Sequence, residues 1–352
     1  METSTNEAKI ISKLKKELIV FLAILTLLTF IHFLWFYINY GTWNNVPVYT
    51  TLVHMLIPAS TAIICMVLFR DQALTRETKF FLGIFIVYTI VFLIESFYRP
   101  LLPQTLIDLP IIKEIPLLSA FIAIFGFISI IIMNLRKIWR EDLKLSKLWF
   151  GINKKFFISF TVLFAIIIVF LFYLNYIFGF GQSLLDYDPG NFIVLYLTLL
   201  SLSFFIIWPQ YFGEEFGWRY YLQDRLFPLF GPYVGVVILG VIWGIWHAGN
   251  IYMGMNWPGQ PLLGNLNMIL ITIILAVIYG YAVLVTRSVW IAVALHLIID
   301  TTEVAAMVYL SQSESIFAFG SGIYSFLILG IFAVLIILLD QKVWKSVKVL
   351  KA

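Results

Sequence analysis

Six residues on successive apolar segments of this chain are of types that can do acid–base chemistry. They are Glu214, Glu215, Arg219, His247, His296 and Asp300. Ionisable groups are costly near lipid, so an acidic pair and histidines inside apolar segments are by default a functional-site hypothesis. A carboxylate and imidazoles can together take a proton from a water molecule. The predicted chemistry is therefore the activation of water.

The acidic pair has two different expected roles. On a helix, Glu215 and Arg219 are i,i+4 neighbours, so the guanidinium can hold that carboxylate in place. At about 3.6 residues per turn, Glu214 points about 100° away and is left as the candidate base. The alternative is an ordinary cluster of charges at a helix end.

The histidines have similar alternatives. Trp243 and His247 share one helix face, as do His296 and Asp300, and Glu303 extends the second stripe by a turn. A carboxylate beside a histidine fixes its tautomer. The alternative is that each histidine is hydrogen-bonded in a helix bundle with a structural role only.

The elements that must position these residues are transmembrane helices. Hydrophobic residues make up 62% of the 352 residues and charged residues 12%, and strands are excluded because backbone groups in lipid need internal partners. The predicted fold is an all-α, polytopic bundle of about ten spans. The apolar segments lie near 18–39, 50–69, 80–97, 117–135, 156–179, 191–212, 229–250, 265–286, 288–310 and 320–340.

Basic residues set the predicted orientation. Of the 23 Lys and Arg residues, all except Arg99 and Lys113 fall on one side of this arrangement, including Arg219. This pattern predicts cytoplasmic N- and C-termini, and it accounts for the net charge of +4 without nucleic-acid binding. The single cysteine, Cys65, cannot form an internal disulfide.

Three regions are expected along the chain. Residues 1–155 form an N-terminal accessory bundle of about four spans with a basic cytoplasmic loop. Residues 156–340 carry the chemical groups, all within 190–310, and 341–352 form a basic cytoplasmic tail.

The turn after the sixth span sets the expected depth of the site. Pro228, Gly231 and Pro232 are helix breakers within residues 227–232. Glu214 and His247 each lie roughly 20 Å from this turn at the helical rise per residue, so they should meet at one level. This extends the sixth helix to about residue 226 and predicts a cavity that opens toward the cytoplasm.

These three groups, in this order, resemble the CPBP family of intramembrane proteases, which includes CAAX prenyl endopeptidases and bacteriocin-immunity proteins. That family's pattern is E-E-x-x-x-R, then F-x-x-x-H, then H-x-x-x-N or H-x-x-x-D. The matching positions are Glu214, Glu215 and Arg219; His247, with Trp243 in place of Phe; and His296 with Asp300. The resemblance covers about 190–310, a third of the chain.

The resemblance implies that Glu214 and His247 activate water, and that groups near His296 and Asp300 stabilise the oxyanion. Because an ionised Asp cannot donate a hydrogen bond as Asn can, we expect Asp300 to orient His296 instead. A zinc site of Glu214, His247 and His296 is the alternative to metal-free glutamate catalysis, which we favour. No H-E-x-x-H spacing indicates a metal, so no cofactor is certain.

The predicted function is therefore an intramembrane endopeptidase that acts on a membrane-embedded or lipid-modified peptide or protein. Its partners are this substrate and the lipid bilayer, not nucleic acid. A multi-pass protein of the cell membrane is expected, with a bacterial plasma membrane favoured. The alternatives are a proton-coupled transporter, in which Glu214, Glu303 and the histidines relay protons, and a catalytically inactive protease-like scaffold or immunity protein.

Overall fold

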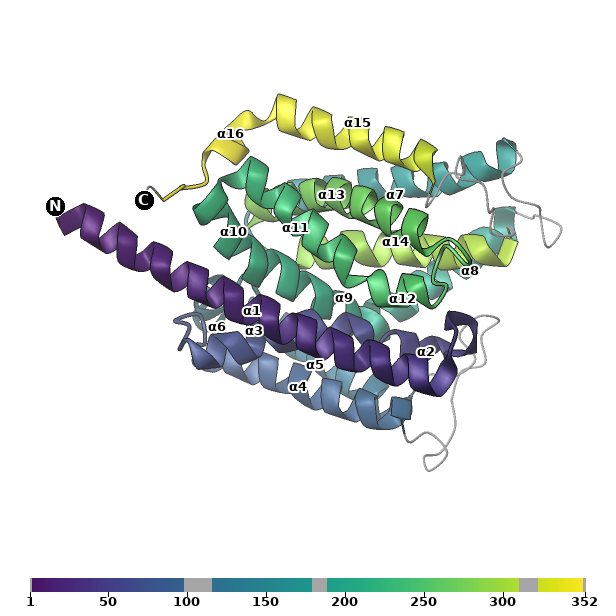
Figure 1. Ribbon diagram of the computed structural model, residues 1–352, viewed down its shortest axis with the longest axis horizontal. Helices are drawn as coiled ribbons and strands as arrows, with labels where there is room; N and C mark the ends of the chain where they lie inside the picture. Colours follow the sequence, from purple (N-terminus) through teal and green to yellow (C-terminus); the bar gives the residue numbers. More distant parts are fainter. Residues whose placement is uncertain (1, 98–115, 179–188, 310–321, 351–352) are drawn as a thin grey trace.

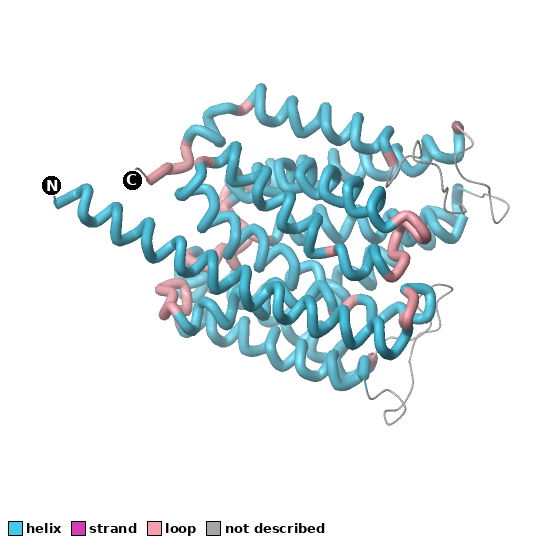
Figure 2. The backbone as a smooth tube through the Cα atoms, viewed as in Figure 1, coloured by secondary structure: helices cyan, strands magenta, loops and turns pink. Residues whose placement is uncertain are grey.

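The computed structural model describes residues 2–97, 116–178, 189–309 and 322–350. Within these ranges the chain forms helices joined by short connections and no strand, as Figures 1 and 2 show. The prediction of an all-α helical bundle is confirmed. Arg99 and Lys113, the two basic residues predicted on the far side, lie outside the described residues.

A helix lies at each of the ten predicted positions. These helices are α1 (Glu2–Tyr40), α3 (Ile57–Leu68), α4 (Arg76–Phe97), α5 (Leu117–Leu135), α7 (Lys154–Ile177), α8 (Pro189–Leu202), α11 (Pro232–Trp246), α13 (Pro261–Thr286), α14 (Trp290–Tyr309) and α15 (Ile323–Leu339). Among the described residues, seven helical runs are long and apolar enough to cross a membrane, while α11 and α15 are shorter apolar helices. The count of ten spans stays a prediction.

The sixth predicted span is longer than expected. It runs through α8, the π-helical segment η4 (Ser203–Ile207), α9 (Trp208–Glu215), the π-helical segment η5 (Phe216–Leu222) and α10 (Gln223–Phe230). The prediction that Pro228 breaks this helix is wrong, because Pro228 lies inside α10. The turn is made at Gly231, whose φ of 77° suits glycine.

The helix ends that carry basic residues gather at one end of the bundle, where both termini also lie (Figure 1). Lys147 pairs with Asp224 at 2.6 Å, and the backbone N–H of Leu350 donates to the Pro228 carbonyl at 2.9 Å. Arg219 differs from the prediction: it does not lie in a cytoplasmic connection but is fully buried inside the bundle. The assignment of this end to the cytoplasm stays a prediction.

The helices α11 and α13 pack closely through small residues. A side chain added at Gly240 would overlap the Ile273 backbone, and one at Gly244 would overlap the Ile269 backbone. The Thr272 hydroxyl donates to the Gly240 carbonyl at 2.8 Å across the same contact. This small-residue packing holds α11, which ends next to His247, against α13.

Replacing Gly240 by alanine should separate α11 from α13 and destabilise the protein by about 1–3 kcal/mol, because the added methyl group has no room. The measurement is thermal unfolding of the purified protein in detergent. Gly83→Ala on α4 is the matched control, since nothing lies within 4 Å of an added methyl group there. Equal melting temperatures for the two variants would contradict the close packing.

The N-terminal segment packs directly on the long sixth helix. A side chain at Gly213 would overlap the Met55 carbonyl, and one at Gly217 would overlap Pro58. Buried residues from α1 to Trp344 form one continuous hydrophobic core. The core is thus shared between the predicted N-terminal bundle and the segment with the chemical groups, and their division into two domains stays a prediction.

Candidate active site

Glu214 lies on α9 and is 2% exposed. Its Oε2 atom accepts a hydrogen bond from the indole N–H of Trp243 at 2.8 Å and another from that of Trp218 at 3.3 Å. These two indole donors were not predicted from the sequence. Among the described residues no donor contacts Oε1, so the carboxylate is fixed through one oxygen and keeps the other for a ligand.

Glu215 connects two elements. Its Oε2 accepts from Arg219 Nε at 2.8 Å, and its Oε1 lies 2.8 Å from His296 Nδ1 on α14. The Arg219 guanidinium also lies over the rings of Trp243 and Tyr279, at 4.8 Å and 5.3 Å from their centroids. The expected Glu215–Arg219 pair is present and, in addition, Glu215 positions His296.

Asp300 contributes less to the orientation of His296 than we expected. Its Oδ2 is 3.6 Å from His296 Nε2, whereas Glu215 lies within hydrogen-bonding distance of the other ring nitrogen. The Asp300 side chain is 38% exposed, and Glu303 follows one turn further along α14. Both acids line the same cavity as His296.

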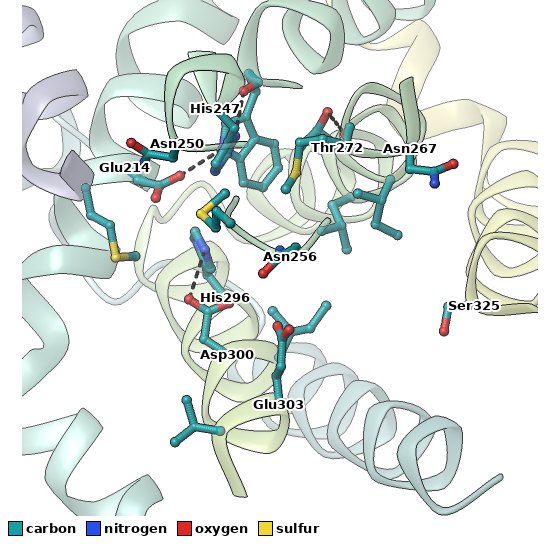
Figure 3. A pocket seen from close by; sticks show the side chains of 18 of the residues that line it. Glu214, His247, Asn250, Asn256, Asn267, Thr272, His296, Asp300, Glu303 and Ser325 are labelled. Atoms are coloured by element: carbon teal, nitrogen blue, oxygen red, sulfur yellow. Dashed lines mark hydrogen bonds and ion pairs between the residues drawn. The ribbon is translucent and has the colours of Figure 1, made fainter. Parts of the chain in front are cut away.

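His247 lies at the end of α11, next to the short helix α12 (Ala248–Tyr252). Its Nδ1 is 2.9 Å from the Trp243 carbonyl oxygen, which can only accept a hydrogen bond, so Nδ1 carries the proton. In the neutral ring this leaves Nε2 as an acceptor. Figure 3 shows His247, Glu214 and His296 around one cavity, and Glu214 and His247 lie together as their predicted common depth requires.

Sequence reasoning missed His54, which also lines the cavity. It lies in the short helix η2 (His54–Leu56) and is 4% exposed. Its ring stacks on Trp246 at 3.5 Å and lies 5.8 Å from the His247 ring, while the Asn250 amide donates to its Nδ1 at 3.0 Å. A histidine within an apolar segment was the available signal, but no local spacing connected it to the other groups.

His54→Phe should destabilise the protein by about 1–3 kcal/mol, because it keeps a ring on Trp246 but leaves the buried Asn250 amide unpaired. Thermal unfolding in detergent measures the effect. His32→Phe is the control, since His32 Nε2 already has no hydrogen-bond partner. A similar loss in both variants would mean that ring packing, and not the amide bond, stabilises this region.

The cavity has a volume of about 340 Å³ and is lined by residues of η2, α7, α9, α11, α13, α14 and α15. It is also lined by Trp43, Thr51, Asn256 and Trp257, from the segments between α1 and η2 and between α12 and α13. In Figure 1, α2 (Val48–Thr51) and α12 lie at the end of the bundle opposite the two termini. That the cavity opens toward the cytoplasm stays a prediction.

The predicted zinc ligands do not fit a metal as they are arranged. No three His, Cys, Asp or Glu side chains of the described ranges converge in a way that could hold an ion. His296 has a carboxylate at each ring nitrogen, and Nδ1 of His247 is taken by a carbonyl. These histidine nitrogens are therefore arranged for hydrogen bonds within the protein and not for a metal ion.

The fold and the site define a multi-helix membrane protein with a carboxylate–imidazole cavity inside the bundle. Residues 193–302, just under a third of the chain, match the family model described as Type II CAAX prenyl endopeptidase Rce1-like. The matched segment is thus similar to the family that the three motifs indicated, and at family level the match indicates a CAAX-type protease acting on a membrane-associated peptide. No curated protein matches the chain.

Proposed function

We propose that this protein is an intramembrane endopeptidase that uses Glu214 as the base for hydrolysis. The observation that carries the proposal is the Glu214 carboxylate, which faces a cavity together with His247 and His296 and is fixed through one oxygen by two indoles. A base that is held still and has one oxygen available to water is what general base catalysis requires.

The proposed reaction begins with a water molecule between Glu214 and the scissile carbonyl. Glu214 takes a proton from the water while the water oxygen bonds to the carbonyl carbon. His247 Nε2 accepts a hydrogen bond from the same water molecule. The proton held by Glu214 then passes to the leaving nitrogen as the C–N bond breaks. No step runs through a metal.

His296 is the proposed electrophilic group. Glu215 holds its Nδ1, which directs the Nε2 side of the ring toward the cavity beside Asp300. A proton on Nε2 stabilises the negative oxygen of the tetrahedral intermediate, and Asp300 limits the rotation of the ring. Arg219 does not contact substrate in this scheme and acts by positioning Glu215.

The test is cleavage of a quenched fluorescent peptide library by the purified protein in detergent. We expect wild type to cleave, Glu214→Ala and His296→Ala not to cleave, and a chelator to have no effect. Loss with chelator that zinc restores would contradict the metal-free mechanism. Equal signals from wild type and variants would come from a contaminant, and the transporter or inactive-scaffold alternatives would then replace the protease.

Trp243→Phe installs the residue of the family pattern and should lower kcat about tenfold or more, because it removes a hydrogen bond to a charged carboxylate. Steady-state kinetics measure the effect. Trp246→Phe is the control, since the Trp246 indole N–H has no partner to lose. An unchanged kcat in Trp243→Phe would mean that the bond to Trp218 alone suffices to hold Glu214.

A further inference from the structure

Three fully buried side chains between the sixth predicted span and α13 carry polar atoms that lack a partner. They are Arg219 in η5, Gln223 at the start of α10 and Tyr279 in α13. Within the described part of the chain, Arg219 Nη1 and Nη2, Gln223 Nε2 and Oε1, and the Tyr279 hydroxyl have no hydrogen-bond partner. Because buried polar groups are as a rule hydrogen-bonded, these atoms indicate a ligand.

The three side chains lie together where η5 packs on α13. Arg219 and Gln223 are four residues apart in one continuous helix, which is about one turn. The Arg219 guanidinium lies over the Tyr279 ring, 5.3 Å from its centroid. Gln223 Oε1 faces the next residue of α13, Gly280, where an added Cβ would lie 3.0 Å from it. Glycine at this position therefore leaves room beside Gln223 that a larger side chain would take.

The kind of ligand follows from the atoms that lack partners and from the charges around them. Donors are present on all three side chains and an acceptor on Gln223, and a water molecule can both accept and donate hydrogen bonds. The charge of Arg219 is already balanced by Glu215 at 2.8 Å. The nearby imidazole of His296 also has a carboxylate beside each ring nitrogen, those of Glu215 and Asp300. An anion would therefore add an uncompensated negative charge to the bundle, so a neutral ligand is favoured.

We propose that ordered water molecules are bound between η5 and α13, where they accept hydrogen bonds from Arg219 Nη1 and Nη2 and connect them to Gln223 and the Tyr279 hydroxyl. This site is separate from the cavity, because Arg219, Gln223 and Tyr279 are not among the residues that line it. The water supplies the hydrogen bonds that a buried ion pair needs in addition to the attraction of its charges. The inference concerns how Arg219 is held in the folded protein, and it does not rest on the proposed function.

The presence of water is tested by brief X-ray irradiation of the purified protein in detergent. Irradiation turns water held beside a side chain into hydroxyl radicals, which oxidise that side chain, and mass spectrometry locates the oxidised residues. We expect Tyr279 to be oxidised although it is fully buried, and Gln223→Leu to reduce this oxidation severalfold. Phe81 is the control, since it is fully buried against the rings of Trp208 and Phe212 and should stay unmodified. Oxidation of Tyr279 that equals that of Phe81, or that Gln223→Leu leaves unchanged, would overturn the proposal.

The contribution of the water to stability is tested by the sign of a change in melting temperature. Gln223→Leu nearly keeps the shape of the side chain but removes both unpaired atoms. In a dry site this exchange should raise the melting temperature or leave it unchanged. With bound water we expect a fall of about 2 °C or more, because the water that bridges to Arg219 loses two of its partners. Thr61→Val is the control, since the buried Thr61 hydroxyl in α3 is also unpaired and its loss should not lower the melting temperature.

An anion in place of water is distinguished by melting the protein at increasing chloride concentration. Water predicts that wild type and Gln223→Leu respond to chloride in the same way. A wild-type melting temperature that rises with chloride, in contrast to that of Gln223→Leu, would identify a bound anion and overturn the proposal. A Gln223→Leu protein that melts above wild type would overturn it as well, because the site would then be dry.

Discussion

Replacing Glu214 by glutamine should lower kcat by about 10²- to 10⁴-fold, the range expected when a general base is removed. Glutamine keeps the size of the side chain, and its amide oxygen can still accept from Trp243 and Trp218, so the packing of this buried position is preserved. What is lost is the ability to take a proton from water. The measurement is kcat on a peptide that wild type cleaves.

The matched control for this variant is Glu141→Gln. Glu141 lies on the surface helix α6 (Lys137–Lys144), where its side chain is 52% exposed and pairs with Lys144. The control should retain wild-type kcat, and both variants should melt at the wild-type temperature. A Glu214→Gln protein that is folded and retains more than a tenth of wild-type kcat would rule out Glu214 as the base.

Replacing Arg219 by methionine should destabilise the protein by about 3–5 kcal/mol, the cost of removing one partner from a buried ion pair. Arg219 and Glu215 are both fully buried and 2.8 Å apart, so the variant leaves the Glu215 carboxylate without its cation. The contacts of the guanidinium with Trp243 and Tyr279 are lost as well. Because Glu215 also holds His296, kcat should fall together with stability.

The control for Arg219 is Lys147→Met, which breaks the partly exposed pair with Asp224 at the basic end. Surface pairs are worth about 1 kcal/mol or less, so this variant should melt close to wild type. Thermal unfolding in detergent compares the two. If Arg219→Met unfolds like Lys147→Met, the buried pair does not hold the site together, and the role given to Glu215 fails with it.

Local spacing was sufficient to predict some contacts of the site. Glu215 and Arg219 are four residues apart, which is about one helical turn. Although the π-helical segment η5 begins between them, the two side chains still form the pair. Glu214 and His247 were predicted to lie at one level because they are about equally many residues from the turn at 227–232. The two residues do line one cavity, although the helix ends after Pro228 and not before it. These features are set by neighbours along the chain or across one hairpin.

Contacts between distant helices could not be predicted in this way. His54 reaches the cavity because η2 packs on α9, and the bond between Glu215 and His296 joins positions 81 residues apart. No role was predicted for Trp218, yet its indole N–H donates to Glu214 at 3.3 Å. Such contacts depend on which helix faces pair in three dimensions, and no periodicity of a single segment encodes that choice.

The tight contacts at Gly213 and Gly217 have a consequence for dissecting this protein. These glycines lie within the segment that matches the family model, but the backbone they touch, at Met55 and Pro58, lies far outside it. A fragment trimmed to residues 193–302 would lack both this backbone and His54. The surface around Gly213 and Gly217 would then be exposed to detergent. Co-expression of two split halves is therefore the better way to dissect this protein, because the N-terminal half supplies part of the wall of the candidate site.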